Sequence, residues 1–387
     1  MSGIKAFVGA RIFDGAEWHD DKVLLIREGR VAAVLDSVPA DAEVIDTDGL
    51  LIAPGFIDLQ INGGGGVMFN NQPDVAGIAR ICSAHAQFGT TALLPTLITD
   101  RTEIIEQLAG VAEACMQIPG VLGFHLEGPA LNRSRKGIHA ESEIRVPNAR
   151  DLAAIKSFGK CGRSLVTLAP ECVPSAMIDD LIGTGLRIAA GHSEATAAQA
   201  NQAANRGVTG VTHLFNAMSQ LGPREPGLVG ASLMDNRLFA GIICDGIHVG
   251  RTSAHIALRC KGRDRLMLVT DAMPLVGTNE TQFMLQGRKI TLAKDRLSGP
   301  DGTLAGAHLS MVEAVCNAMA LLDVELTDAL IMASRTPAAF LGLESELGRI
   351  APGYRADLVA FRENNFDVVG TWVGGIGSMS ETSGALH

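Results

Sequence analysis

The sequence predicts an α/β protein, a (β/α)8 TIM-like barrel with a small β-sandwich domain formed by both chain ends. Three observations support this fold class. Short apolar runs alternate with helix-like stretches through the middle of the chain, which is typical of a parallel sheet. Eight such units occupy residues 56–272, close to the roughly 250 residues of a typical barrel. Both chain ends are instead rich in β-like runs separated by Gly, Asp and Pro turns.

The two chain ends have the same strand-forming character. The β-like runs near them cover residues 5–15, 22–35, 42–55, 357–361 and 368–373. We therefore expect one small β-domain from 1–53 plus 345–387, beside a barrel domain over 54–344. The small, polar residues 378–387 are expected to form a loose tail.

Each predicted barrel strand is a short apolar run that ends in polar, Gly or Pro residues. The eight runs are 56–59, 92–97, 120–127, 164–170, 187–193, 210–215, 239–245 and 266–272. Helical stretches are expected between them, for example over 76–89 and 193–207. After the eighth strand, residues 277–306 are typical of an inserted β-hairpin. Two further helices are predicted over 306–322 and 326–340.

The composition is that of an ordinary globular protein. Of 387 residues, 47% are hydrophobic and 19% charged, and no apolar run reaches the roughly 18 residues of a membrane span. The net charge of −10 and the lack of a basic stripe argue against nucleic acid as a partner. The N-terminus lacks the apolar core of a signal peptide. Seven scattered cysteines without a CxxC pair indicate reduced thiols and a cytoplasmic location.

Polar residues gather where the predicted strands end, and barrel enzymes place their active sites at that face. These residues are Asp58, Gln60, Asn62, His125, Glu127, His192, His213, Asp245, His248 and Asp271. A single histidine in such a place is usually a packing or loop residue. Buried charges and imidazoles at several strand ends are costly unless they are paired or bind a metal. We therefore predict one shared metal or catalytic site.

Glu127, His192 and His213 supply one carboxylate and two imidazoles. That set is common at a catalytic Zn²⁺ that keeps a fourth position for water. Asp271 is placed to take a proton from the water and to return it to the leaving group. Its alternative roles are to orient a ligand or to cap a helix.

Several stretches resemble the N-acetylglucosamine-6-phosphate deacetylases of the amidohydrolase superfamily. They are "PGFIDLQINGGGG", "HLEGPALNRSRKGIH", "GHSEAT", "THLFNAMSQLGPREPGLVGA", "DGIHV", "VTDAM", "GTLAGAHLSM", "RTPAAFLGL", "LGRIAPGYRADLV" and "VVGTWVGG". The likeness covers nearly the whole chain. It implies hydrolysis of N-acetyl-D-glucosamine 6-phosphate to D-glucosamine 6-phosphate and acetate, in amino-sugar catabolism and cell-wall sugar recycling. Deacetylation of another amino-sugar phosphate, such as N-acetylgalactosamine 6-phosphate, is the alternative.

The first predicted strand ends in Gln60 and Asn62, where many metal-dependent barrel hydrolases carry His-x-His. The resemblance implies two sub-patterns in the family, of which the one with Gln-x-Asn holds a single metal on the Glu and the two His. Amides are weaker ligands for Zn²⁺ than imidazole. We expect one divalent metal ion per subunit, Zn²⁺, on Glu127, His192 and His213.

The resemblance also implies roles for single residues. Asp271 resembles the catalytic acid and base, and His139 resembles the residue that polarises the acetamide carbonyl or contacts the sugar. The implied substrate-binding residues are His139, Asn216, Ala217, Arg224, His248, Leu304, Ala305 and Gly306. Arg224 and His248 resemble the phosphate binders, one or both of which would cross the interface of a homodimer.

One position departs from the family pattern. His308 follows Ala307 where a small and then an apolar residue are usual. The imidazole would either narrow the acetyl pocket or point away from it. The tolerance for other N-acyl groups therefore stays open.

Two other functions are less compatible with the sequence. A two-metal cyclic amidase with a carboxylated lysine is disfavoured by Gln60, by Asn62, and by "LAPE" at the end of the fourth strand. A catalytically inactive binding protein is disfavoured by the intact set of Glu127, His192, His213 and Asp271.

Overall fold

A computed structural model of the chain describes residues 3–379. Its centre is a sheet of eight parallel strands whose spatial order follows the chain. The strands are β8 (Phe56–Ile61), β11 (Thr90–Ile98), β12 (His125–Glu127), β13 (Leu165–Leu168), β14 (Arg187–Ala190), β15 (Gly210–Val211), β16 (Phe239–Ile242) and β17 (Leu266–Leu268). The sheet closes where Ile61 bridges Ala272 and the Asn62 amide donates to the Ala272 carbonyl at 2.8 Å. This nearly closed barrel confirms the predicted fold class.

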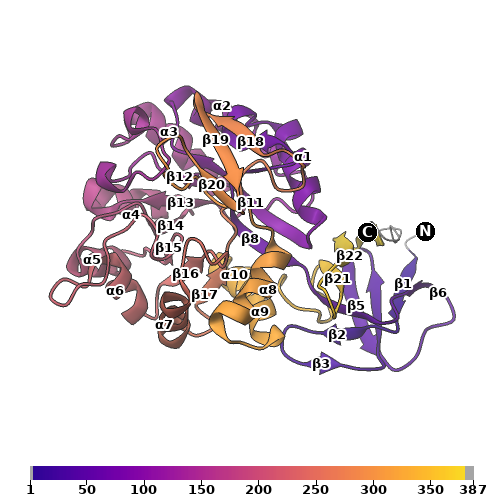
Figure 1. The fold of residues 1–387 in the computed structure, drawn as a ribbon. Coiled ribbons are helices and arrows are strands. Elements are labelled where there is room, and N and C mark those ends of the chain that lie inside the picture. Colours follow the sequence, from indigo (N-terminus) through magenta and orange to yellow (C-terminus); the bar gives the residue numbers. More distant parts are fainter. Residues whose placement is uncertain (1–2, 380–387) are drawn as a thin grey trace.

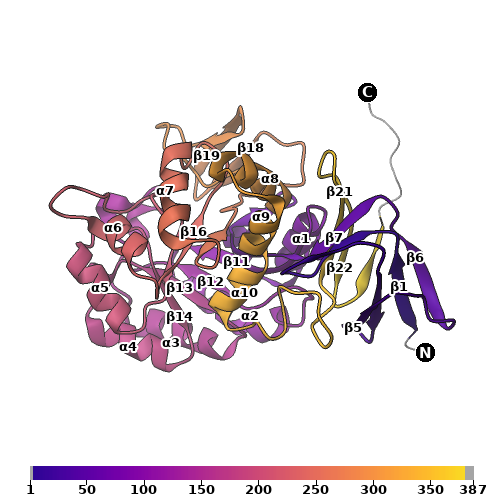
Figure 2. The ribbon, with the colours of Figure 1, turned by 90° about the horizontal axis from the view of Figure 1, so that it is seen from below.

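Helices on the outside cover the barrel strands (Figure 2). They are α1 (Val75–Ala86), α2 (Thr102–Cys115), α3 (Ala149–Ser157), α4 (Ser175–Gly183), α5 (Ala197–Asn205), α6 (Gly227–Met234) and α7 (Arg251–Lys261). Helix α5 shows why the Ala-rich stretch is helical. The Thr196 side chain caps its first turn in a reciprocal pair with Gln199, and Ala200, Ala203 and Ala204 form its buried face.

Short 3₁₀ helices connect several of these elements. They are η1 (Phe69–Asn71), η2 (Arg133–Arg135), η3 (Glu141–Glu143), η4 (Phe158–Lys160) and η5 (Pro170–Cys172). The element η2 lies in the long connection between β12 and α3, beside the barrel mouth. Among the described helices, none is both long and apolar enough to cross a membrane.

The segment after β17 differs from the prediction in three details. The expected hairpin is a three-stranded antiparallel sheet of β18 (Gln282–Leu285), β19 (Arg288–Ala293) and β20 (Arg296–Ser298). The helix expected from residue 306 begins only at Met311, as α8 (Met311–Leu322), because Ser310 is its N-cap. The helix expected over 326–340 is two helices, α9 (Leu326–Ala333) and α10 (Arg335–Leu341), because the backbone of Ser334 leaves the helical region.

Both chain ends build two further sheets beside the barrel, where Figure 1 shows indigo and yellow strands side by side. One has the order β5 (Arg30–Leu35), β4 (Val23–Arg27), β1 (Ile4–Val8) and β6 (Ala42–Asp46). The other has the order β23 (Ile376–Met379), β22 (Val368–Val373), β21 (Leu358–Arg362), β7 (Leu50–Pro54), β2 (Arg11–Phe13) and β3 (Trp18–His19). A separate two-stranded hairpin, β9 (Gly63–Gly64) with β10 (Val67–Met68), follows β8.

The two end sheets share one apolar core, as a sandwich requires. The Phe7 ring of β1 meets the Trp372 ring of β22 edge-on, with 5.0 Å between centroids. Residues from both chain ends therefore pack in one cluster, and the division into 1–53 plus 345–387 and 54–344 stays a prediction. Strand β23 includes residues 378 and 379 of the expected tail, and residues 380–387 lie outside the described part of the chain.

Candidate active site

Four polar side chains meet at the carboxyl ends of the barrel strands. Glu127 ends β12, His192 and His213 follow β14 and β15 by two residues, and Asp271 follows β17 by three. Glu127 Oε1 lies 3.2 Å from His192 Nε2 and 3.1 Å from His213 Nε2, and the two nitrogens are 3.0 Å apart. Ligand atoms at tetrahedral zinc, about 2.0–2.1 Å from the ion, lie roughly 3.3 Å apart. The three atoms thus have the spacing of a metal site.

Backbone strain accompanies these positions. His192, His213, Ala217 and Asp271 have φ values of 48°, 32°, 50° and 53°, in the left-handed region that such residues rarely adopt. Strain of this kind persists where the surrounding structure enforces it, and it is concentrated at functional sites. His192, His213 and Asp271 lie two or three residues after β14, β15 and β17, so the left-handed backbone bends the chain just beyond these strand ends.

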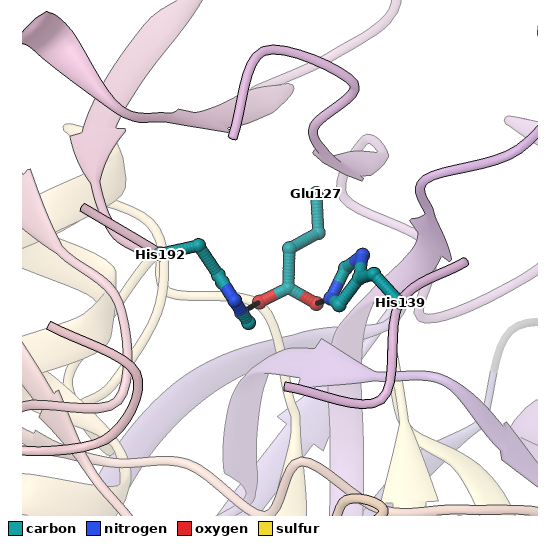
Figure 3. A group of neighbouring side chains, drawn as sticks. All are labelled: Glu127, His139 and His192. Carbon is teal, nitrogen blue, oxygen red and sulfur yellow. Dashed lines mark hydrogen bonds and ion pairs between the residues drawn. The ribbon is translucent and has the colours of Figure 1, made fainter. Parts of the chain in front are cut away.

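His139 completes a group with Glu127 and His192 whose possible ligand atoms all lie within 4.8 Å of one another (Figure 3). Its Nδ1 accepts a hydrogen bond from the Thr99 amide at 3.3 Å. The proton of a neutral His139 therefore sits on Nε2, which faces Glu127 Oε2 at 3.5 Å. A nitrogen that carries its proton is a donor and not a metal ligand. The hydrogen bonds of His139 favour a donor role.

The opposite arrangement holds at His192. Its Nδ1 lies 2.8 Å from the Arg135 carbonyl, to which only a protonated nitrogen can donate. The lone pair of a neutral His192 is then on Nε2, toward Glu127. Such a carbonyl partner is typical of a metal-ligating histidine, because it fixes the tautomer and the ring orientation.

The electrostatics of the cluster favour a bound cation. Burial opposes ionisation of Glu127, but hydrogen bonds from His139, His192 and His213 outweigh it and hold the pKa of this carboxyl well below its usual range. Burial also opposes protonation of His213, yet the Glu127 carboxylate raises the pKa of this imidazole. Burial, together with His139, lowers the pKa of His192. The cluster thus attracts positive charge, and its donor set fits a divalent metal.

Gln60 and Asn62 act as donors to the carboxylates. Gln60 Nε2 lies 3.1 Å from both Glu127 Oε1 and Asp271 Oδ1, and Asn62 Nδ2 donates to Asp271 Oδ1 at 2.6 Å. The side-chain amides of Gln60 and Asn62 therefore stand where a His-x-His pair would hold a second metal ion. Burial and the charge of Glu127 raise the pKa of Asp271 to about 6, which suits an acid and base near neutral pH.

A cavity of about 320 Å³ opens above this cluster. It brings together most of the residues that the sequence singles out: Glu127, His139, His192, His213, Asn216, Ala217, His248, Asp271, Leu304 and Gly306. Two predicted substrate-binding residues do not line it. Ala305 is fully buried in an apolar cluster that also contains Met68 and Met273, and Arg224 is exposed on the loop before α6.

His248 lines the cavity of its own chain, with Nδ1 2.5 Å from Asp245 Oδ2. The Asp245 carboxylate also accepts from the backbone amides of Ile247 and His248, so the imidazole is held from one side. Of the two residues expected to reach a neighbouring subunit, His248 is thus already part of its own site. Cross-subunit donation remains a prediction for Arg224.

His308 points away from this cavity. It lines a larger one of about 850 Å³, beside α8 and the turn between β21 and β22. The sequence left two orientations of His308 open. Because His308 lines the other cavity, it does not narrow the acetyl pocket.

Two strand-end residues lie below the cavity, inside the barrel. Burial raises the pKa of Asp58 to about 7 against its hydrogen bonds, of which Oδ2 takes one from the Thr270 hydroxyl at 2.5 Å. His125 Nε2 lies 2.7 Å from the Thr167 hydroxyl and its Nδ1 3.1 Å from the Leu59 carbonyl. These groups hold the first, third, fourth and eighth strands together.

Sequence reasoning missed several lining residues. The apolar ones are Ile98, Ile138, Ile243 and Met273. They carry no sequence signal, because an apolar residue at a strand end is the ordinary core pattern. Arg135 was also missed, although it stands four residues before the predicted site residue His139 in the basic stretch "NRSRKGIH".

Comparison with known proteins agrees with this geometry. The Amidohydrolase family model matches residues 51–376. The chain belongs to the amidohydrolase family. A relative from Shewanella sp. (strain ANA-3), an N-acetylgalactosamine-6-phosphate deacetylase, is 42% identical over 85% of this chain and 83% of its own length. The N-acetylglucosamine-6-phosphate deacetylase of Haemophilus influenzae is 33% identical over 96% of this amidohydrolase and 98% of its own length.

Solved structures support the same family. The crystal structure of N-acetylglucosamine-6-phosphate deacetylase from Pasteurella multocida superposes on this amidohydrolase with a TM-score of 0.94. The two chains are 34% identical, and the match covers 97% of this chain and 100% of that one.

Proposed function

We propose that this amidohydrolase hydrolyses N-acetyl-D-glucosamine 6-phosphate to D-glucosamine 6-phosphate and acetate, in amino-sugar catabolism and cell-wall sugar recycling. One observation carries the proposal. Glu127, His192, His213, His139 and Asp271 converge in one cavity, with hydrogen bonds that suit three ligands, one donor and one base. Relatives with this activity match nearly the whole chain.

Glu127, His192 and His213 are the proposed ligands of one divalent metal ion per subunit, Zn²⁺. When bound, that ion supplies Lewis-acid chemistry, which polarises a carbonyl and makes water nucleophilic near neutral pH. The tautomer of His192 is set by the Arg135 carbonyl, and that of His139 by the Thr99 amide. These two hydrogen bonds leave the Nε2 lone pair of His192 available to the metal and place a proton on Nε2 of His139, which makes His139 a donor.

His139 is the proposed donor to the acetamide oxygen. His139 lines the cavity, and its Nε2 proton, 3.5 Å from Glu127 Oε2, could stabilise the negative charge that develops on a substrate carbonyl oxygen. Asp271 is the proposed general base and acid. It takes the proton of the attacking water and later gives it to the amine nitrogen, which is a poor leaving group unless protonated.

The remaining lining residues would hold the sugar. Asn216 and Ala217, beside the His213 turn, and Leu304 and Gly306, beside Asp271, are placed to contact the sugar and the acetyl group. Ile98 and Met273 add the apolar surface that a methyl group needs. His248 would donate to the phosphate from its own chain.

A homodimer would bring Arg224 to the phosphate of the neighbouring site. Arg224 is exposed and outside its own cavity, and its planar guanidinium suits phosphate. Two large apolar side chains are exposed at this surface: Leu221, which lies beside Gly230 of α6, is 58% exposed, and Met234, the last residue of α6, is 81% exposed. Exposed apolar side chains of this kind suit a subunit interface. A cytoplasmic location is proposed because all seven cysteines are free thiols.

Amine release from a panel of N-acetylated sugars tests the function. We expect turnover of N-acetylglucosamine 6-phosphate, with much less on N-acetylglucosamine. The Shewanella relative favours N-acetylgalactosamine 6-phosphate as a second candidate substrate. A higher kcat/KM for that epimer would replace the glucosamine assignment, and no amine release from any phosphorylated sugar would refute both.

A further inference from the structure

A strap of residues 132–139 closes one side of the cavity. Five of its residues line the cavity: Ser134, Arg135, Gly137, Ile138 and His139. The strap is tied to the turn after β14 by two backbone contacts. The Asn132 amide donates to the His192 carbonyl at 2.8 Å, and His192 Nδ1 donates to the Arg135 carbonyl at 2.8 Å. The position of Arg135 is therefore fixed by its main chain.

The side chain of Arg135 is held along one edge. Its Nε donates to Glu194 Oε1. The backbone of Glu194 is held in turn, because its amide donates to Glu171 Oε1 at 2.6 Å. The Glu171 carboxylate also accepts hydrogen bonds from the Ser193 hydroxyl and the Asn132 side-chain amide. Within residues 3–379, no hydrogen bond from the two terminal nitrogens of Arg135 is seen. The side chain is 33% exposed, and Arg135 lines the cavity.

The negative charge around the cavity makes a cationic residue such as Arg135 important for binding an anionic substrate. The chain carries a net charge of −10, and Glu127 and Asp271 stand on the cavity floor. A dianionic phosphosugar needs local positive charge to overcome that field. Among the described residues that line the cavity, Arg135 is the one with a permanent positive charge.

We propose that Arg135 is a phosphate-binding residue supplied by the same chain, whose terminal nitrogens grip the substrate phosphate while Nε stays on Glu194. This assignment rests on the proposed function and adds a binding residue that the sequence motifs do not assign. A guanidinium with one edge anchored loses little side-chain entropy on binding, and its other nitrogens form charge-assisted hydrogen bonds.

A purely structural role makes a different prediction. The contact to His192 uses the backbone carbonyl of Arg135, which a side-chain substitution leaves in place. If the side chain only stiffened the strap, its loss would disturb His139 and His192, and would affect phosphorylated and unphosphorylated sugars alike.

The test compares Arg135→Gln, Arg135→Lys and the control Arg133→Gln. Arg133 is an exposed strap arginine that does not line the cavity, so its variant removes the same charge at the same strap. For Arg135→Gln we expect KM for N-acetylglucosamine 6-phosphate to rise about 10- to 100-fold, the scale of a lost charged hydrogen bond. Its kcat, its zinc content and its kcat/KM on N-acetylglucosamine should change little. Arg135→Lys should fall between wild type and Arg135→Gln.

Two outcomes would overturn the assignment. One is an unchanged KM for the phosphorylated sugar in Arg135→Gln, and the other is an equal loss on both sugars or in Arg133→Gln. Wild-type enzyme in the same series separates this inference from the proposed function. If wild type deacetylates the phosphosugar and Arg135→Gln does so equally well, only the role of Arg135 is rejected. If wild type does not prefer the phosphorylated sugar, both are rejected.

Discussion

Asp271 has one carboxylate oxygen that is engaged and one that is available. Oδ1 accepts from both Gln60 and Asn62, whereas no described residue donates to Oδ2. A proton transferred during the reaction would therefore go to Oδ2. The amides that replace a His-x-His pair thus have a positive role, because they orient the proposed base.

The variant Asp271→Asn tests this role. It keeps the shape of the side chain and removes its basicity, so kcat should fall by roughly 10²- to 10⁴-fold. Zinc content should remain that of wild type, since Asp271 is not among the proposed ligands. Loss of zinc together with activity would make Asp271 a ligand and contradict the assignment.

Most of the site could be predicted at the residue scale because its polar groups stand at strand ends. Glu127, His192, His213 and Asp271 were found in this way, and they meet as expected. The different roles of His139 and His213 were expected only from the family resemblance, because the physical reason for the role of His139, the Thr99 amide on its Nδ1, cannot be read from the sequence. Arg135 was missed because its importance comes from the strap, whose path over the cavity has no sequence pattern.

Among the elements, the segment between β20 and α8 shows why helix boundaries were less predictable than strands. Leu304 and Ala307 form isolated bridges here: Leu304 pairs with Ser298, the Ala307 amide donates to the Asp271 carbonyl at 2.9 Å, and the Met273 amide donates to the Ala307 carbonyl at 3.0 Å. Such isolated bridges leave no period-2 pattern in the sequence, so the predicted helix began too early, at residue 306. The eight barrel strands were recognisable because apolar runs and turns recur at regular intervals.

Gly306 is required by this pairing. Its φ is +62°, and a Cβ there would lie 2.8 Å from the Asp271 carbonyl and 2.8 Å from Met273. Gly306→Ala should lower the free energy of unfolding by more than Gly302→Ala, whose φ of +81° is similarly strained but whose Cβ would meet nothing within 4 Å. Strain alone costs about 1–3 kcal/mol. Equal losses in denaturant unfolding would show that the close approach at Gly306 is unimportant.

Helix α1 contributes a pH-dependent contact. Burial lowers the pKa of His85 to about 4, and its Nε2 donates to the Gly63 carbonyl at 2.9 Å. The folded state therefore favours neutral His85. Its contribution is complete above pH 6.5 and is lost as the pH falls toward 4, by an amount on the order of 3 kcal/mol.

The variant His85→Gln isolates this contribution. The difference in unfolding free energy between wild type and variant should shrink as the pH falls from 6.5 to 4, because only wild type loses the contribution of a buried neutral imidazole. A difference that is constant over this range would show that His85 does not titrate there.

For the whole molecule, the prediction to test is that Arg224 serves the active site of a neighbouring subunit. Co-expression of Asp271→Asn with Arg224→Ala should restore activity if Arg224 serves its neighbour, because one site of each mixed dimer then receives both intact residues. The control pair, Asp271→Asn with His139→Ala, should restore none, since both residues line the same chain's cavity. No recovery in verified mixed dimers would mean that Arg224 does not cross the interface.

The central claim is that one metal ion per chain, held by Glu127, His192 and His213, supports the deacetylation. Titration of metal-free enzyme with zinc, with bound zinc and deacetylase activity measured on each sample, tests it most directly. We predict that activity rises in proportion to bound zinc and stops rising at about one ion per chain. Activity that requires a second tightly bound ion, or full activity without any metal, would contradict the account.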